Sequence, residues 1–298
     1  MQSDERPAWN GPSRQATAMG WRCRKQQGQN VQSTVPYRSR QVSSAFLALG
    51  FILLLPVSQA AAFDPGKGQT SDDPWAAFRL GFDAYRSGDK KEAVEAYRYA
   101  ADKGHAGAQW KLARMYADGD GVNRNEYEAF KIFRKIVRLG AEPGSPNESY
   151  VSDALVALAG YVRRGIPKSP VHSDPRLARD LYLQAASMFG NPEAQFEMGQ
   201  MLLEGDGGRA NRKQAARWFS LSARKGHYKA EAMLGDLLVQ DGKMVRGLAM
   251  LTAALERAQP GDRDWIRARQ EEAFGLAAES DRRTAMVLAD QYLSEGYK

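Results

Sequence analysis

The sequence predicts an all-α protein in which antiparallel helix pairs stack into a solenoid. Three observations support this fold class: one segment repeats without gaps at an offset of 86 residues, another fits the same frame 36 residues earlier, and apolar residues within each segment recur at helical spacing. A single helix pair cannot cover its own apolar face, so neighbouring pairs must pack together.

The clearest repeat relates residues 108–140 to residues 194–226. The final glycines of two successive units, Gly140 and Gly190, lie 50 residues apart, so that unit carries 14 extra residues: about ten near 141–149 and about four near 167–173. The identities across the offset of 86 are Ala108/Ala194, Gln109/Gln195, Met115/Met201, Gly119/Gly205, Asp120/Asp206, Gly121/Gly207, Asn125/Asn211, Ala129/Ala215, Phe133/Phe219, Arg138/Arg224 and Gly140/Gly226.

Each unit has the pattern of two helices joined by a turn. In the unit that ends at Gly140, the turn Asp118-Gly119-Asp120-Gly121 supplies glycines that can adopt positive φ and so end the first helix. The apolar stripes on either side predict that both helices bury one face. In the first helix the stripe is Ala108, Leu112, Met115 and Tyr116, and in the second it is Ala129, Phe130, Phe133 and Val137.

The repeat frame divides the chain into four parts. Residues 1–62 are predicted to be a leader with a signal peptide, and residues 63–75 a linker. Residues 76–258 are predicted to form five helix-pair repeats. The remaining residues, 259–298, keep helical spacing of their apolar side chains, which predicts two capping helices.

The leader has the order of a secretory signal. Arg38 and Arg40 precede an apolar core at 45–55, and small residues follow it. This predicts cleavage between Ala62 and Phe63 and a periplasmic mature protein that is not embedded in the membrane. The apolar core has 11 residues, whereas a membrane span needs about 20, so an uncleaved anchor is the weaker interpretation. The stretch before Arg38 is consistent with an extension from an upstream start codon.

The basic character of the chain belongs to this leader. The whole chain has a net charge of +7, but residues 1–62 contain seven basic and two acidic residues, so the remainder carries only +2. A nucleic-acid reader normally has a basic folded domain, so we do not expect a nucleic-acid partner. The single cysteine, Cys23, also lies in the leader, so the mature chain must be stabilised by packing rather than by disulfides.

No catalytic, metal or cofactor constellation is apparent in the sequence. His105 and His227 each follow the final glycine of a unit, which favours a role in the turn between repeats over a catalytic or metal-binding role. The loops at 118–122 and 204–208 lack the ligand spacing of a calcium-binding loop. We therefore expect that the protein is not an enzyme and holds no cofactor.

The segment AQWKLARMYADGDGVNRNEYEAFKIFRKIVRLG resembles the Sel-one-like repeat, a relative of the tetratricopeptide repeat. A secreted chain with this repeat order is also similar to the ExoR-type periplasmic regulators of α-proteobacteria. That resemblance implies a negative regulator that binds the periplasmic domain of a membrane sensor histidine kinase and controls exopolysaccharide synthesis in two-component signalling. The long leader departs from the family pattern.

Two hypotheses about function follow. The first is a periplasmic regulator that holds a partner protein on its solenoid surface, and the second is an accessory protein that binds or remodels envelope polymer such as peptidoglycan or polysaccharide. Some equivalent positions differ in charge between repeats, and the enlarged third repeat adds two arginines. We predict that these residues form the partner-binding surface; the alternative is that they are simply solvated helix positions. These residues are Lys111, Arg114, Arg163, Arg164, Glu197 and Gln200, and the inserted loop at 142–149 lies beside them in sequence.

Overall fold

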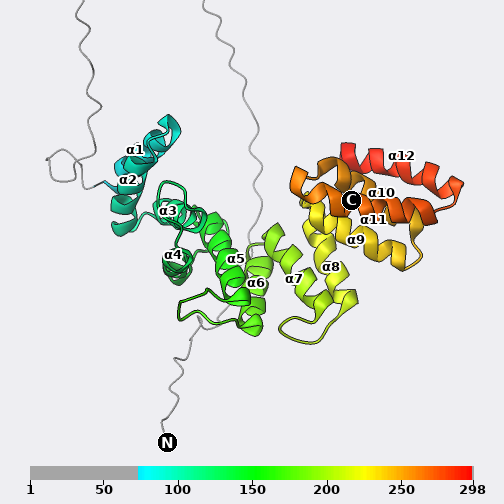
Figure 1. Cartoon of the computed structure of the whole chain (residues 1–298), viewed down its shortest axis with the longest axis horizontal. Helices are drawn as coiled ribbons and strands as arrows, with labels where there is room; N and C mark the ends of the chain where they lie inside the picture. The colour runs from blue at the N-terminus through cyan, green and yellow to red at the C-terminus, as the bar shows by residue number, and fades with distance from the viewer. Residues whose placement is uncertain (1–72, 297–298) are drawn as a thin grey trace, which may run out of the picture. The chain divides into compact units, whose positions relative to one another are not determined.

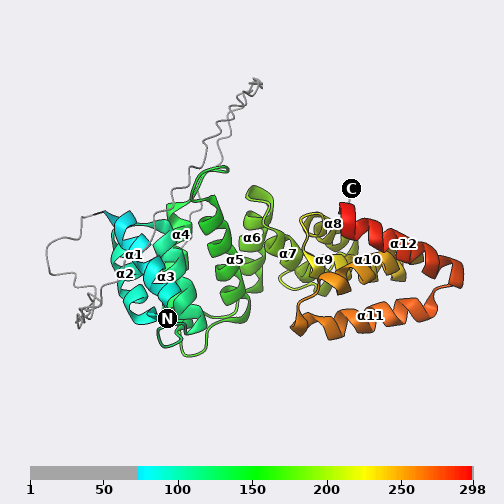
Figure 2. The same ribbon diagram turned by 90° about the horizontal axis from the view of Figure 1, so that it is seen from above.

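The computed structural model describes residues 73–296, and within them it contains twelve α-helices, one short 3₁₀ helix and no strand. The predicted all-α fold is confirmed. Figures 1 and 2 show that consecutive helices lie side by side along the chain. The predicted leader, with its apolar core and its cleavage site at Ala62 and Phe63, lies outside the described residues.

Ten of the helices form five antiparallel pairs. In each pair we call the odd-numbered helix the first helix and the even-numbered one the second. The pairs are α1 (Pro74–Ser87) with α2 (Lys90–Asp102), α3 (Ala106–Asp118) with α4 (Glu126–Leu139), α5 (Glu148–Arg164) with α6 (Pro175–Met188), α7 (Pro192–Glu204) with α8 (Arg212–Ala223), and α9 (Tyr228–Gln240) with α10 (Met244–Arg257).

In two of the pairs, a bulky side chain of the second helix packs directly on a glycine of the first. A methyl carbon added at Gly199 in α7 would lie 2.4 Å from Cε1 of Phe219 in α8, far inside contact distance. At Gly81 in α1 the added carbon would lie 2.8 Å from the ring of Tyr97 in α2. The rings of Tyr97 and Phe219 are buried, so close backbone approach and aromatic burial occur at the same point.

Successive pairs are joined by a repeated polar contact. The side-chain amide of Gln109 in α3 donates to the carbonyl oxygen of Ala101 in α2 at 3.0 Å, and Gln195 in α7 donates to that of Ala186 in α6 at 3.3 Å. Both amides are buried. They bond to carbonyls in the last turn of the preceding second helix, and the Ala101 carbonyl also accepts from the backbone N–H of Gly104 at 3.0 Å. The two glutamines, identical across the offset of 86, therefore fix one repeat on the next.

The third pair accommodates its extra residues partly as helix. α5 has 17 residues, whereas α3 and α7 have 13 each. The loop before α5 runs from 140 to 147, so Glu148 and Ser149, expected in the inserted loop, form the first turn of α5 instead. The connection between α5 and α6 is pinned down by backbone contacts, including Asp174 N to the Val162 carbonyl at 2.8 Å.

The C-terminal part continues the helical packing. After the 3₁₀ turn Pro260–Asp262, α11 (Arg263–Leu276) and α12 (Glu279–Glu295) pack on α10 and bury Ile266, Ala285 and Ala289. Between residues 73 and 296, none of the helices combines the length and the apolar character that crossing a membrane requires.

We predict that Phe133→Ala and Phe219→Ala each destabilise the whole described fold. Both rings are almost completely buried, with 1% and 0% exposure, and they occupy the same position in two pairs. Removing such a ring leaves a cavity and lowers the free energy of unfolding by about 3–5 kcal/mol. Thermal melting followed by circular dichroism measures the effect. A variant that kept its melting temperature and lost only partner binding would contradict this role.

Candidate functional site

The six residues of the predicted partner-binding surface all lie on first helices. Lys111 and Arg114 lie in α3, Arg163 and Arg164 end α5, and Glu197 and Gln200 lie in α7. The structure brings Arg163 and Glu197 into contact, whereas Lys111 and Arg114 contact other residues.

Lys111 belongs to a polar cluster between the first two pairs. Its Nζ lies 3.6 Å from the ring centroid of Tyr85, whose hydroxyl donates to Oδ2 of Asp120 at 2.6 Å. Lys90 donates to the other carboxylate oxygen of Asp120 at 2.5 Å. These hydrogen bonds from Lys90 and Tyr85 lower the pKa of Asp120, and partial burial lowers the pKa of Lys111. Lys111 is therefore half-buried against the preceding repeat rather than fully available to a partner.

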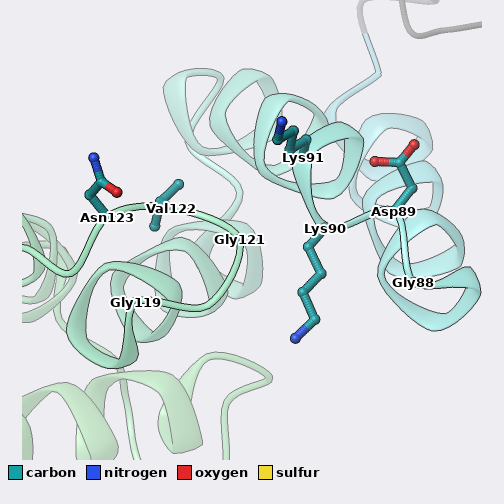
Figure 3. A pocket seen from close by; sticks show the side chains of 8 residues that line it. All are labelled: Gly88, Asp89, Lys90, Lys91, Gly119, Gly121, Val122 and Asn123. Atoms are coloured by element: carbon teal, nitrogen blue, oxygen red, sulfur yellow. The ribbon is translucent and has the colours of Figure 1, made fainter.

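An open depression of about 920 Å³ lies beside this cluster, between the α1–α2 turn and the α3–α4 loop. Three of its eight lining residues are glycines, Gly88, Gly119 and Gly121. Figure 3 shows that Lys90 and Lys91 point to opposite sides of the first turn of α2, so their charges do not converge on one point. The lining contains one carboxylate, that of Asp89, and no nucleophile beside a base.

Arg163 and Glu197 contact each other. The guanidinium of Arg163 donates to Glu197 at 3.0 Å, to Glu204 at 2.7 Å and to Asp206 at 2.7 Å, which connects the end of α5 to the middle of α7, to its last residue and to the loop after it. Burial raises the pKa of Glu197. Three carboxylates surround one arginine, so the cluster retains negative charge at neutral pH.

Arg114 and Arg164 are the most accessible charges of the set. The Arg114 side chain is 52% exposed, and among residues 73–296 its ion pair is with Asp118 of its own helix, at 3.4 Å. The Arg164 side chain is 55% exposed, lies 4.6 Å from the Tyr161 ring centroid and reaches Glu126 in α4 at 3.4 Å. Gln200 is partly exposed on α7.

The Asp-Gly-Asp-Gly loop at 118–121 and the Glu-Gly-Asp-Gly loop at 204–207 are structural turns. Asp120 and Asp206 occupy equivalent positions, and each carboxylate accepts hydrogen bonds from the preceding pair, from Tyr85 and Lys90 in one case and from Arg163 in the other. Gly207 has a φ of 71°, and an added methyl carbon there would lie 2.4 Å from the carbonyl oxygen of Pro175. Among the residues that the structure describes, no three His, Cys, Asp or Glu side chains gather as metal ligands would.

The histidines between repeats serve as helix caps. The Nδ1 of His105 accepts from the backbone N–H of Ala108 at 3.1 Å, and the Nδ1 of His227 accepts from that of Ala230 at 3.2 Å. Asn191 caps α7 from the position equivalent to His105. The interpretation of His105 and His227 as residues of the turn between repeats is confirmed.

The second helices carry a surface that the sequence reasoning missed. α8 contains Arg212, Lys213 and Arg217 and no acidic residue, and the exposed Leu183 and Leu221 lie on α6 and α8. The net charge of the whole chain does not show this local excess of basic residues. Counting basic and acidic residues separately for each predicted helix would have revealed it.

The comparisons with known proteins agree with the fold and the repeat frame. The Sel1 repeat model matches residues 76–105, 106–140, 152–188 and 192–227, which are the first four helix pairs. Among solved structures, a protective antigen of uropathogenic Escherichia coli strains that displays an SLR fold aligns with a TM-score of 0.62 and 24% identity. The alignment covers 75% of this chain and 46% of that one, and it supports the fold alone.

Two relatives carry the same name. The chain is 54% identical to the exopolysaccharide production negative regulator of Rhizobium meliloti (strain 1021) over 77% of this chain and 86% of that protein. It is 47% identical to the protein of the same name from Rhizobium leguminosarum bv. viciae, over 82% and 93%. The resemblance inferred from the repeat order is thus confirmed, and the chain belongs to the Sel1-repeat family of ExoR-type exopolysaccharide production negative regulators.

Proposed function

We propose that this protein is a negative regulator of exopolysaccharide production that acts in the periplasm by holding the periplasmic domain of a membrane sensor histidine kinase. The observation that carries the proposal is the identity of 54% to a relative named for this regulation, over most of both chains. The kinase partner and the periplasmic location come from the family resemblance and from the signal-like order of the leader.

The fold supports binding rather than catalysis. Stacked helix pairs present a row of first-helix surfaces, one from each repeat, and such surfaces bind other proteins in helical-repeat families. The polar groups near the candidate surface are already engaged in structural contacts, as Asp120 and Arg163 illustrate. The proposed regulator is therefore a binding protein without an enzymatic step.

The residues of the predicted surface differ in how far their side chains are exposed and free of structural contacts. Arg163 and Glu197 neutralise one another, and Lys111 packs on Tyr85, so substituting any of these three would disturb the scaffold. Arg114 and Arg164 extend more than half-exposed from α3 and α5. We propose that these two arginines make the direct contacts with the partner, because exposed charges near an interface steer encounter and set its salt dependence.

We predict that export removes residues 1–62. The cationic residues, the apolar core and the alanines stand in the order that signal peptidase recognises, so the mature chain should begin at Phe63. Mass spectrometry of the protein from the periplasmic fraction measures the N-terminus. Recovery of the full-length chain from the cytoplasm, with none in the periplasm, would contradict the proposed location.

We predict that Arg114→Glu weakens repression without unfolding the protein. The substitution reverses an exposed charge whose ion pair, among residues 73–296, is with Asp118 on the same helix. Exopolysaccharide should rise toward the level of a strain that lacks the gene, and affinity for the purified periplasmic kinase domain should fall. Isothermal titration calorimetry measures the affinity, and the melting temperature monitors the fold.

Arg283→Glu is the matched control. Arg283 in α12 is 77% exposed and pairs at 3.7 Å with Glu279 on its own helix, so the same charge reversal occurs far from the candidate surface in sequence. This control should repress normally. Normal repression and normal kinase binding by a folded Arg114→Glu variant, also when it is combined with a shortened 142–147 loop, would refute the proposed contact surface.

A further inference from the structure

The two helices of the central pairs carry opposite charge. The first helices α3, α5 and α7 contain four basic and six acidic residues, whereas the second helices α4, α6 and α8 contain nine basic and three acidic ones. The basic residues of the second helices are Lys131, Arg134, Lys135, Arg138, Arg176, Arg179, Arg212, Lys213 and Arg217. A nearly balanced repeat domain therefore has a distinctly basic second-helix face.

An apolar groove of about 450 Å³ opens on this face between α6 and α8. Met198 and Leu202 of α7 form its floor and are buried. Leu183 of α6 and Leu221 of α8 line its walls and are 41% and 43% exposed. Leucines with this degree of exposure around a buried apolar floor leave a hydrophobic surface that no described part of the chain covers.

Cations border the groove and lack counter-charges. Arg179 and Arg217 line it together with Gln214 and Trp218, and no carboxylate does. Neither arginine forms an ion pair with any residue that the structure describes. The neighbouring Arg212 is different, because it pairs with Asp241 at 3.0 Å. The acidic residue of α6, Asp180, does not line the groove.

We propose that the groove between α6 and α8 binds an acidic amphipathic helix of a partner protein. Leucine-type side chains of that helix fill the space above Met198 and Leu202, and its carboxylates pair with Arg179 and Arg217. The proposal extends the proposed function in one respect, since it assumes that the chain acts by holding another protein. It adds a second contact surface on the second helices, whereas Arg114 and Arg164 lie on first helices.

The apolar lining decides between classes of partner. A nucleic acid or a membrane surface is recognised chiefly through rows of phosphates, for which exposed leucines around a narrow groove supply no contact. A helix with an apolar stripe flanked by acidic residues matches both the leucines and the arginines. Charge complementarity therefore selects an acidic helix over a basic one.

The probe is a fluorescein-labelled peptide of about 20 residues, with leucines at helical i, i+3, i+4 and i+7 positions and glutamates on both flanks. A second peptide carries lysine in place of each glutamate. Anisotropy titrations use the full secreted protein, the R217E/L221Q variant and the R283E/V287Q variant. The last is a matched control, because Arg283 and Val287 are also one helical turn apart and are 77% and 72% exposed.

The acidic peptide is expected to bind at least about tenfold more tightly than the lysine peptide, because it complements the arginines, and R217E/L221Q should remove that preference. The control variant should bind like the unmodified protein, and all three proteins should melt alike. Equal binding of both peptides, or undiminished binding by a folded R217E/L221Q variant, would overturn the proposal. Binding of phosphatidylglycerol vesicles through the same residues, without peptide binding, would overturn it in favour of a membrane surface.

The test is independent of the proposed function. If loss of the gene left exopolysaccharide unchanged while the acidic peptide bound at α6 and α8, the regulatory role would fail and the groove assignment would stand. If the gene controlled exopolysaccharide while the peptide did not bind, the regulatory role would stand and the groove assignment would fail.

Discussion

The structure depends on the close approach of the two helices within a pair, at a point where a small residue of the first helix lets the second helix come near. Gly81 faces Tyr97 and Gly199 faces Phe219. At Gly235 in α9 an added methyl carbon would lie 2.9 Å from the carbonyl oxygen of Gly247 in α10 and 3.1 Å from Cγ of Leu251, so there the two backbones themselves are close. Ala113 and Phe133 occupy the equivalent positions in the α3/α4 pair and share one buried cluster. This contact sets the spacing of the helices, and the spacing determines which side chains of neighbouring repeats can meet.

Once the pairs are closed, the two helices of each pair face different surroundings. The first helices use polar side chains to attach to neighbouring repeats: Gln109 contacts Ala101 of the preceding repeat, and Arg163 contacts Asp206 of the following one. On the second helices α6 and α8, Arg179 and Arg217 border an apolar groove without an ion pair to any described residue. A single scaffold thus presents two surfaces of different chemistry.

Local sequence patterns predicted the fold because its determinants recur at fixed spacing. The identity of Phe133 and Phe219 across the offset of 86 indicated their shared burial, which the structure confirms. The small residues at 81, 113, 199 and 235 were harder to align, because a two-residue turn joins α1 to α2 whereas seven residues join α3 to α4. The contact of Arg163 with Glu197 was beyond sequence reasoning, since 34 residues separate them and only the packing of α5 on its neighbours brings them together.

The stability of Gly199→Ala relative to Gly160→Ala tests the central contact most directly. Both glycines lie inside helices, so alanine alone should add about 0.4–1 kcal/mol to the free energy of unfolding. At Gly160 the new carbon meets its nearest neighbours at 3.5 Å, an ordinary contact, so that gain should appear. At Gly199 it would lie 2.4 Å from Phe219, and overpacking of this kind costs about 1–3 kcal/mol. Urea unfolding should show Gly160→Ala unchanged or stabilised and Gly199→Ala destabilised; equal stabilisation of both would contradict the account.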